Sequence, residues 1–570
     1  MRIALCQLDF TVGDISGNIR KVLDAVAKCR DYGAEIFVFP ELALSGYPPE
    51  DLLFKKDFIH DVKAGLEKIA GEVKEELLII GFPEQSEDDL YNSAAFLNNG
   101  KIVGMYRKAC LPNYGVFDEK RYFTPGSTSI LLDCVKSRIG VNICEDMWVS
   151  PGVTEQLSAC GADLIINISA SPYHRGKIRE RIDILSERAV SNKITICYLN
   201  MVGGQDELVF DGGSTVLSDE GDLILKMPQF EECIDYLDLV HERESGNFRE
   251  INRIDRLDAE VIKVDIRQNV NKKRIHNVIC PDLSDEEEVF TALKTGLRDY
   301  VYKNGFKKVV VGVSGGIDSA LTAAIAVEAL GNENVLGVTM PSRYTSIESK
   351  ELSKKLLDNL GVEHIDVPID DIFKAYLKSL ERTFTGLPTD ITEENIQARI
   401  RGNILMAFSN KFGYLVLNTG NKSEVSVGYC TLYGDMAGGF AVLKDVLKTW
   451  VYKLANYYNE KFGFEAIPSE IISREPTAEL KFNQKDSDAI PPYRILDPIL
   501  DAYIEDEQDV NGICALGFDR NLVRSIINKA DRNEYKRRQA PPGIKITVKA
   551  FGRDRRFPIT NRYNNATPIV

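Results

Sequence analysis

The clearest chemical signal in the sequence is a short stretch of small and polar residues, Ser-Gly-Gly-Ile-Asp-Ser, at 314–319. An apolar run at 309–313 precedes it and a run rich in alanine at 320–326 follows it, which predicts a strand, a tight turn and a helix. Glycines at such a junction let the backbone approach a ligand, and the helix adds the positive end of its dipole. The stretch is therefore expected to bind a phosphate group.

No Gly-Lys-Ser/Thr follows these glycines, so the stretch is not the common P-loop. Its pattern instead resembles the pyrophosphate loop of the ATP-pyrophosphatase family, whose members split ATP into AMP and pyrophosphate to adenylate a carbonyl oxygen. The alternative is an ordinary glycine turn in an α/β unit. The joint presence of Ser314, Asp318 and Ser319 favours the phosphate loop over that alternative.

Three further residues that could do chemistry, Glu41, Lys108 and Cys144, stand at the ends of predicted strands in the first half. A free thiol has a pKa of about 8.5 and is mostly neutral at pH 7, so a nucleophilic cysteine needs a base and a cation nearby. A glutamate and a lysine could supply them. Taken singly, each residue also has a structural explanation: a core cysteine, a loop glutamate and a solvated lysine.

Together the three residues resemble the Glu-Lys-Cys triad of the nitrilase superfamily of carbon–nitrogen hydrolases, in the order along the chain that is typical of it. The resemblance implies that Glu41 takes the thiol proton, that Cys144 attacks an amide carbon and that Lys108 stabilises the oxyanion. Glu119 falls where many nitrilases have a second glutamate.

The same resemblance implies a substrate for this first site. Tyr114, Ser171 and Lys177 stand where glutamine-using members of the superfamily hold the amino and carboxylate groups of the substrate. A small zwitterion needs partners of opposite charge and hydrogen-bonding groups to be held in register. Arg175 is close enough in sequence to compete with Lys177 for the carboxylate, and the choice between them stays open.

The composition is that of an ordinary globular protein, with 44% hydrophobic and 27% charged residues in a chain of 570. This length predicts two or three domains. The net charge of −15 argues against binding to nucleic acids or anionic membranes, which needs an excess of lysine and arginine. Eleven cysteines without Cys-x-x-Cys pairs, and five histidines, indicate neither a disulfide framework nor a zinc site. Without a signal peptide or an apolar run long enough to span a bilayer, we expect a cytoplasmic protein.

Short apolar runs alternate with stretches of helical spacing along most of the chain. Strands are expected at 3–6, 36–39, 77–81, 102–105, 138–144, 164–168 and 194–199 in the first half, with a helix at 18–30. In the second half they are expected at 309–313, 335–340, 364–367 and 414–417, each followed by a helical stretch. Alternating strands and helices predict an α/β fold with functional residues at strand ends.

The pattern predicts two domains joined by a connector. Residues 1–245 are expected to form a layered domain with the α-β-β-α order that the nitrilase resemblance implies. Residues 281–570 are expected to form a doubly wound parallel sheet. The polar stretch 246–280 is interpreted as a connector over the surface, and the acidic run 282–288 as the solvated start of a helix.

Segments through the second half narrow the resemblance to the family of glutamine-dependent NAD synthetases. They lie at 395–401, 419–424, 438–445, 474–480, 486–488 and 535–542. In that family the synthetase adenylates the nicotinic acid carboxylate of deamido-NAD with ATP, and ammonia from glutamine then displaces AMP. Ammonia is protonated in neutral water, so a sheltered passage between the two sites would keep it nucleophilic.

The resemblance also assigns ligand-binding residues in the second half by position. ATP would be bound by Gly312, Val313, Ser314, Gly315, Gly316, Ile317, Asp318, Ser319, Thr419, Lys448 and Thr477, and deamido-NAD by Asn395, Arg399, Glu424 and Lys536. Mg²⁺, which usually compensates charge as pyrophosphate leaves ATP, would be held by Asp318 and Glu424, although Glu424 could serve the dinucleotide instead. Arg553, Arg555 and Arg556 are interpreted as a solvated face.

Other enzymes also join a pyrophosphate loop to a glutaminase. GMP synthetase uses a Cys-His-Glu glutaminase and asparagine synthetase an N-terminal cysteine, whereas residue 2 here is Arg2 and no histidine follows a thiol in a suitable motif. Two alternatives of other classes stay open: an amidase whose second half only binds nucleotide, and a scaffold of two inactive domains. Conversion of deamido-NAD to NAD with consumption of ATP would separate a synthetase from all of them.

A helix predicted at 395–408 bears on assembly. Its apolar side chains recur at helical spacing beside polar ones, and they are Ile396, Ile400, Ile404, Leu405 and Phe408. This stripe could pack on a second copy of the chain, as the family resemblance implies, or on the chain's own sheet. The first possibility predicts a homo-oligomer.

Overall fold

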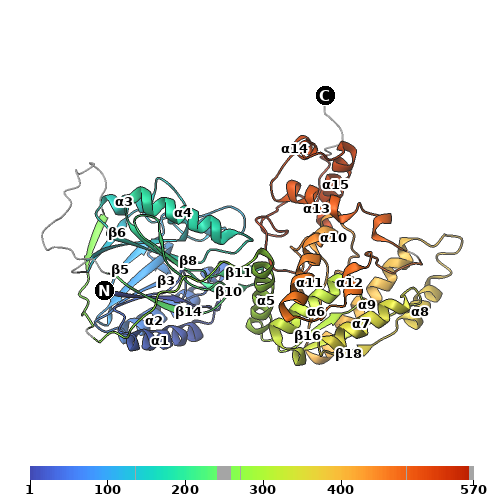
Figure 1. Ribbon diagram of the computed structural model, residues 1–570, viewed down its shortest axis with the longest axis horizontal. Helices are drawn as coiled ribbons and strands as arrows, with labels where there is room; N and C mark the ends of the chain where they lie inside the picture. The colour runs from blue at the N-terminus through green and yellow to red at the C-terminus, as the bar shows by residue number, and fades with distance from the viewer. Residues whose placement is uncertain (135–136, 240–258, 270, 483, 564–570) are drawn as a thin grey trace. The chain divides into compact units, whose positions relative to one another are not determined.

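The structure is a computed structural model that describes residues 1–134, 137–239, 259–269, 271–482 and 484–563. The chain folds as two compact units, each with its own hydrophobic core. The first unit comprises Met1–Gln205 and Val209–Asp282, and the second comprises Asp206–Leu208 and Leu283–Val570. In Figure 1 the first unit runs from blue to green and the second mainly from green to red.

Two sheets lie at the centre of the first unit, in the strand orders β14-β1-β2-β3-β4-β5 and β13-β12-β9-β8-β7-β6-β15. The first sheet consists of β1 (Arg2–Gln7), β2 (Ile36–Val38), β3 (Leu77–Ser86), β4 (Asp89–Asn98), β5 (Lys101–Arg107) and β14 (Cys233–Asp238). The second consists of β6 (Ser129–Cys134), β7 (Ser137–Ile143), β8 (Leu164–Ser169), β9 (Thr195–Asn200), β12 (Thr215–Leu217), β13 (Leu223–Lys226) and β15 (Ala259–Lys263). A separate ribbon pairs β10 (Val202–Gln205) with β11 (Leu208–Asp211).

Helices cover the outer faces of the two sheets (Figure 1). On the first sheet, α2 (Lys56–Glu72) packs against β3 and β5, with α1 (Ile15–Asp31) beside it. On the second, α3 (Val153–Ala159) packs against β6 and β7, and α4 (Lys177–Asn192) against β9 and β12. Strand residues of both sheets, such as Val38 and Val141, share one buried core. The expected α-β-β-α order is therefore confirmed.

Parallel strands bring the candidate residues of this unit to strand ends. β1, β2 and β3 are parallel, and so are β7, β8 and β9. The chain leaves β2 toward Glu41, β5 toward Lys108 and β7 into Cys144. Strands form at all seven positions expected from the sequence in this half. Ligands in α/β folds bind where the carboxyl ends of such strands meet.

The stretch expected as a connector contains a strand. Residues 246–258 and 270 of this stretch lie outside the described residues, but β15 pairs in parallel with β6 at the edge of the second sheet, with Val261 opposite Leu131. Its residues are exposed or half-buried, and the charged Glu260 and Lys263 interrupt the run of apolar side chains by which the other strands are found. Backbone pairing at a sheet edge needs no such run.

A five-stranded parallel sheet lies at the centre of the second unit, in the order β18-β17-β16-β19-β20. Its strands are β16 (Val309–Gly312), β17 (Val335–Thr339), β18 (Glu363–Asp366), β19 (Leu415–Asn418) and β20 (Phe440–Ala441). The four expected strands and the doubly wound parallel arrangement are confirmed. The sequence does not predict β20, because two residues are too few for a periodic pattern.

Helices surround this sheet and extend beyond it. They are α5 (Asp285–Lys303), α6 (Ile317–Leu330), α7 (Ile347–Asn359), α8 (Asp370–Leu380), α9 (Ile391–Phe412), α10 (Lys422–Val427), α11 (Lys448–Phe462), α12 (Ser469–Ser473), α13 (Tyr493–Ile504), α14 (Val510–Ala515), α15 (Arg520–Arg532) and α16 (Glu534–Arg537). Ser284 caps α5 by accepting a hydrogen bond from the Glu287 N–H, so the acidic run does begin a helix. None of the helices formed by the described residues is long and apolar enough to cross a membrane.

The apolar stripe of α9 packs on the chain's own sheet. Ile396, Ile400 and Leu405 are buried in one cluster with Val310 and Val338 of the sheet. Of the two interpretations of this stripe, the structure favours the internal one. The stripe consequently gives no support to a partner copy.

Arg555 corrects another expectation from the sequence. Its guanidinium lies 2.9 Å from Asp531, and both side chains are buried. The prediction of a solvated face is therefore wrong for this arginine, whereas Arg556 is exposed. A run of arginines in the sequence does not show that one of them pairs with a carboxylate from a distant segment. Here that carboxylate is Asp531 on α15.

Candidate active sites

A buried lysine joins two glutamates in the first unit. Lys108 donates from Nζ to Glu41 Oε1 at 2.7 Å and to both carboxylate oxygens of Glu119 at 2.9 Å. Burial by itself would lower the pKa of Lys108, but the carboxylates of Glu119 and Glu41 outweigh it and hold that pKa well above its usual value. Burial raises the pKa of Glu119 to about 7, against the opposing effect of Lys108. The arrangement is a buried centre in which one cation is shared by two acids.

Cys144 stands where β7 ends, with a backbone φ of +43°. Residues other than glycine rarely adopt a positive φ, and such strain gathers at functional sites. The thiol belongs to a residue that is 2% exposed. Burial raises the pKa of Cys144 well above its usual value, Glu41 adds to that rise and Lys108 opposes it. The resting side chain is therefore a neutral thiol, which needs a base in order to react as a nucleophile.

Asp146 fastens the turn that carries Cys144 to the segment that carries Lys108. One of its oxygens accepts a hydrogen bond from the Ile143 N–H at 3.0 Å, and the other accepts one from the Cys110 N–H at 2.7 Å. These donors are neighbours of the cysteine and of the lysine in the chain, so a single buried carboxylate fixes the two segments relative to each other. Sequence reasoning missed this residue because an acid beside a cysteine carries no pattern of its own.

Two of the residues predicted to hold glutamine lie near this centre. Ser171 is buried after the end of β8, and its N–H donates to Asn200 Oδ1 at 2.9 Å. Lys177 begins α4 with its Nζ 4.3 Å from the ring centroid of Trp148. Burial lowers the pKa of Lys177, and the charge of Glu180 opposes that effect. A desolvated ammonium beside the nucleophile could bind a substrate carboxylate.

Tyr114 is more open to solvent than the other predicted glutamine contacts. It is 59% exposed, and its hydroxyl donates to Glu145 Oε2 at 3.0 Å. Glu145 directly follows the candidate nucleophile in the sequence, so Tyr114 stands at the outer side of the same site. Arg175, the rival of Lys177 for the carboxylate, lies half-buried in the turn before α4.

In the second unit, the predicted phosphate loop joins β16 to α6. The Ser314 N–H donates to Ser319 Oγ at 3.3 Å, and the Ser319 hydroxyl donates to Gly316 O at 2.9 Å. Gly315 has a φ of +83°, and a Cβ at this position would lie 2.6 Å from the backbone oxygen of Ser349. Only glycine fits there. The loop therefore has the tight glycine turn that the sequence predicts.

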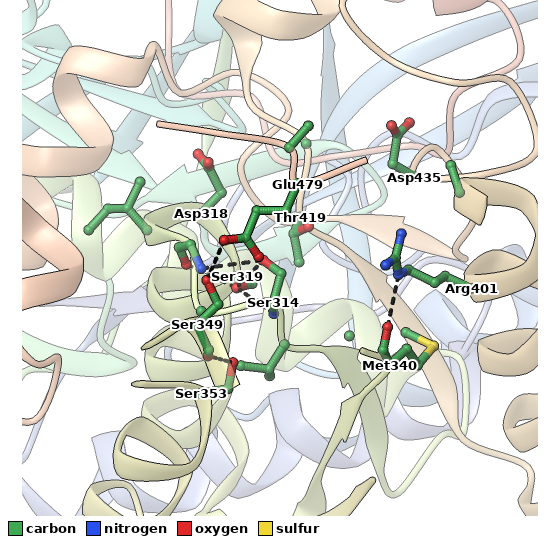
Figure 2. Close-up of a pocket in the computed structure, with 18 of the residues that line it drawn as sticks. Ser314, Asp318, Ser319, Met340, Ser349, Ser353, Arg401, Thr419, Asp435 and Glu479 are labelled. Carbon is green, nitrogen blue, oxygen red and sulfur yellow. Dashed lines mark hydrogen bonds between the residues drawn. The ribbon is translucent and has the colours of Figure 1, made fainter. Parts of the chain in front are cut away.

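This loop forms part of a cavity of about 710 Å³. Figure 2 shows Ser314, Asp318 and Ser319 gathered on one side with Glu479 next to them, while Arg401 and Asp435 lie on the other. Every residue predicted to bind ATP lines this cavity, from Gly312 through Ser319 and including Thr419, Lys448 and Thr477; Glu424 also lines it. Cavities of this size hold drug-sized and cofactor-sized ligands.

A lysine stands between two acidic side chains beside the loop. Lys448 pairs with Asp318, and its Nζ lies 3.3 Å from Glu424 Oε1. Burial raises the pKa of Glu424 to about 8, against the opposing effect of Lys448. Burial alone would lower the pKa of Lys448, but Asp318 and Glu424 raise it above its usual value. Carboxylates beside a phosphate loop fit Mg²⁺, which is usually bound by one or two carboxylates together with substrate phosphates.

No cluster of three or more acidic, histidine or cysteine side chains suited to a metal occurs among the described residues. A cation at Asp318 and Glu424 would therefore take its remaining ligands from a bound substrate or from water. Mg²⁺ is usually coordinated in this way in nucleotide-binding sites.

Three residues predicted to bind the dinucleotide are not among the described residues that line the cavity. Asn395 Oδ1 accepts a hydrogen bond from a threonine hydroxyl at 2.8 Å. Arg399 is exposed and donates to a backbone carbonyl at 3.2 Å. Lys536 donates from Nζ to two backbone carbonyls, each at 2.7 Å. All three are thus in contact with the protein itself in this structure.

Arg401, which sequence reasoning did not select, lines the cavity two residues after Arg399. Its Nε donates to Met340 O at 3.0 Å (Figure 2), and burial lowers the pKa of Arg401 to about 10. The sequence did contain a signal for the position of Arg401. Ala398, Arg401, Gly402 and Leu405 recur at helical spacing and share the face of α9 that lines the cavity.

Comparison with known proteins matches each half of the chain to a protein family. Residues 2–244 match the carbon-nitrogen hydrolase family, and residues 289–540 match the NAD synthase family. The glutamine-dependent NAD(+) synthetase of Thermotoga maritima is 49% identical, with 99% of each chain covered, and that of Aquifex aeolicus is 46% identical, with 99% of this chain and 100% of the other covered. The solved structure of the glutamine-dependent NAD+ synthetase from Acinetobacter baumannii in complex with ADP is 42% identical over 98% of both chains, with a TM-score of 0.75. The chain belongs to the family of glutamine-dependent NAD(+) synthetases.

Proposed function

We propose that the first unit hydrolyses glutamine to glutamate and ammonia, and that the second unit uses this ammonia and ATP to convert deamido-NAD to NAD. AMP and pyrophosphate are the other products. The observation that carries the proposal is the presence of one separate reaction centre in each unit: the buried Glu41–Lys108 pair acting on Cys144, and the phosphate loop in its cavity. The ADP in the related Acinetobacter structure supports an adenine nucleotide as ligand of the second.

In the glutaminase reaction, Glu41 accepts the thiol proton while Cys144 Sγ attacks the amide carbon of glutamine. The ammonium of Lys108 stabilises the oxyanion that forms. Ammonia leaves with the proton that Glu41 returns, and water then hydrolyses the thioester to glutamate. Glu119 holds Lys108 from its other side, through two hydrogen bonds of 2.9 Å.

The α-substituents of glutamine are held by Tyr114, Ser171 and Lys177. Of the two candidates for the substrate carboxylate, Lys177 is favoured over Arg175, because its ammonium lies 4.3 Å from the ring centroid of Trp148, in the segment that follows Cys144. The exposed Tyr114 closes the outer side of the site.

In the synthetase reaction, the loop N–H groups and the N-terminal end of α6 bind the phosphates of ATP. A carboxylate oxygen of deamido-NAD attacks the α-phosphorus and pyrophosphate leaves; ammonia then attacks the activated carbonyl carbon and AMP leaves. Thr419 and Thr477 contact ATP from the cavity lining. Asn395, Arg399 and Lys536 remain proposed contacts of the dinucleotide, and Arg401 adds a half-buried cation to the lining.

Asp318 and Glu424 are proposed to hold Mg²⁺, with Lys448 balancing the two carboxylates between them. Of the two roles considered for Glu424, we favour the metal role because its carboxylate lines the cavity of the phosphate loop together with Asp318. When bound, Mg²⁺ compensates the charge of the phosphates as pyrophosphate departs.

One assay tests the proposed function. With ATP, deamido-NAD, glutamine and Mg²⁺, the purified protein should form NAD, AMP and pyrophosphate in equal amounts. EDTA should stop all three while glutamate formation survives at least in part, because no metal takes part in the thiol chemistry of the first unit. Chromatographic product analysis measures each compound. Full NAD synthesis in EDTA would refute the metal role of Asp318 and Glu424, and hydrolysis of glutamine without any NAD would favour the simple amidase.

A homo-oligomer is a further part of the proposal. Its support is a set of exposed apolar side chains on α9, which includes Met406 at 37% and Phe412 at 56% exposure. Phe412→Asp should therefore lower the oligomer fraction in sedimentation velocity, whereas Asn410→Asp, a polar change on the same helix, should not. A wild-type protein that sediments as a fully active monomer would end this part of the proposal.

We also propose a cytoplasmic location. All eleven cysteines are free thiols in the structure, which is typical of proteins in reducing compartments. Cell fractionation followed by activity measurement would test it.

A further inference from the structure

Asn92 lies beside the glutaminase centre although no motif in the sequence points to it. It is on β4 and 1% exposed. Its Nδ2 donates to Glu41 Oε1 at 2.7 Å, and its backbone oxygen accepts a hydrogen bond from the Lys108 N–H at 2.8 Å. One residue thus contacts both the proposed base and the backbone of the proposed oxyanion-stabilising lysine.

Three donors surround the carboxylate of Glu41. Oε1 accepts from Asn92 and from Lys108, each at 2.7 Å, and Oε2 accepts from the Ala170 N–H at 2.9 Å. Lys108 divides its ammonium between Glu41 and Glu119, so its charge is only partly available to the base. The amide of Asn92 stabilises the charged form of Glu41 without bringing another charge into the site.

The chemistry of the amide explains why an asparagine is suited to this place. Glu41 as a carboxylate can only accept hydrogen bonds, so the end of Asn92 that faces it is the NH₂ group. The other end, Oδ1, is buried and has no hydrogen-bond partner among the described residues. Leaving a buried acceptor unpaired is unfavourable, so a structural network around Oδ1 does not account for this residue. Its contact with Glu41 does.

We propose that Asn92 is a positioning residue of the glutaminase, which orients Glu41 and keeps it in the carboxylate form that accepts the thiol proton. The inference rests on the proposed role of Glu41 as the base. The titratable groups that interact electrostatically with Glu41 come from four segments and are Tyr47, Lys108, Glu119 and Cys144. None of them is changed by a substitution at Asn92.

The test is the pH dependence of kcat/KM for glutamine in two variants. Asn92→Asp places a second carboxyl group against Glu41 in nearly the same volume, and two carboxyl groups this close disfavour ionisation of one of the pair by about one pH unit or more. The acid limb of the profile should move to higher pH by that amount. Asn92→Ala removes the donor alone and should move the limb in the same direction by less. KM for glutamine should change little, because the hydrogen bonds of Asn92 among the described residues go to Glu41 and Lys108 and not to the proposed glutamine-binding residues.

Asn98→Ala is the matched control. Asn98 is also buried on β4, but its Nδ2 donates to two backbone carbonyls, of Glu76 and Asp265, and to no catalytic group. This variant should keep the wild-type position of the acid limb. Thermal unfolding reports whether each variant is folded, and if the aspartate variant does not fold, the alanine variant decides.

Two results would overturn the inference: folded Asn92 variants with a wild-type profile, or folded variants that lose the same factor of activity at every pH. Glu41→Gln separates this failure from failure of the proposed function. If Glu41→Gln still hydrolyses glutamine, the role of Glu41 is wrong; if it is inactive while the Asn92 variants show no shifted limb, only the role of Asn92 is wrong.

Discussion

Replacing Cys144 with alanine is expected to abolish NAD synthesis from glutamine and to leave synthesis from ammonium salts at the wild-type rate. The variant removes the only sulfur that can form the thioester in this scheme, whereas the phosphate loop and its cavity lie in the other unit and keep their own substrates. NAD formation should be measured with each nitrogen source in turn. With glutamine it should fall below detection.

Cys197→Ala is the matched control for this experiment, because Cys197 is also a fully buried thiol of the first unit but lies within β9. It should keep both activities. The reciprocal change, Asp318→Ala, should stop synthesis from either nitrogen source and leave glutamate formation. Equal loss of both activities in a folded Cys144→Ala protein would contradict the assignment of the two reactions to two sites.

Replacing Lys108 with methionine is expected to slow glutamine hydrolysis by about 10²- to 10³-fold, the usual cost of losing one electrostatic donor to an oxyanion. KM should change much less, because the ammonium acts mainly on charge that develops in the transition state. Loss of this cation also leaves Glu41 and Glu119 buried side by side. Since Lys108 opposes the rise of the Glu119 pKa, that pKa should climb above about 7 in the variant.

The exposed Lys120 offers a control of the same chemistry, and Lys120→Met should leave the rate unchanged. Removing one partner of a buried ion pair typically costs about 3–5 kcal/mol of stability, so thermal unfolding has to accompany the kinetics. A folded Lys108→Met protein that hydrolyses glutamine at a near-normal rate would show that Lys108 serves only to balance the two buried carboxylates.

Strong apolar runs made the framework of both sites predictable. Glu41, Lys108 and Cys144 each follow such a run, so their placement at strand ends follows from the pattern of the chain. The phosphate loop is predictable for the same reason, because an apolar strand precedes its glycines and a helix follows them, as a phosphate-binding turn requires. β15 and β20 were not predictable, because one is too polar and the other too short to carry a periodic signal.

Residues that support the catalytic groups were much harder to find from the sequence. Asn92 lies within an ordinary strand, and Asp146 follows another acidic residue. Neither the residue type nor its position in the sequence therefore points to a supporting role. Their roles depend on hydrogen bonds to residues far away in the chain. Asn92 and Glu41, for example, are 51 positions apart. Arg555 was misjudged for the same reason, because its partner Asp531 comes from another segment. Hydrogen bonds and ion pairs between distant segments leave no local pattern in the sequence.

The burial of Cys144 also protects the protein from oxidants. Peroxides convert accessible thiolates to sulfenic acids, while buried neutral thiols react slowly. Cys144 is nearly inaccessible, and its raised pKa keeps it protonated at rest. Glu41, the proposed base for that proton, is itself held by three hydrogen bonds. We therefore expect the thiol of Cys144 to be oxidised more slowly than an exposed thiolate under the same conditions.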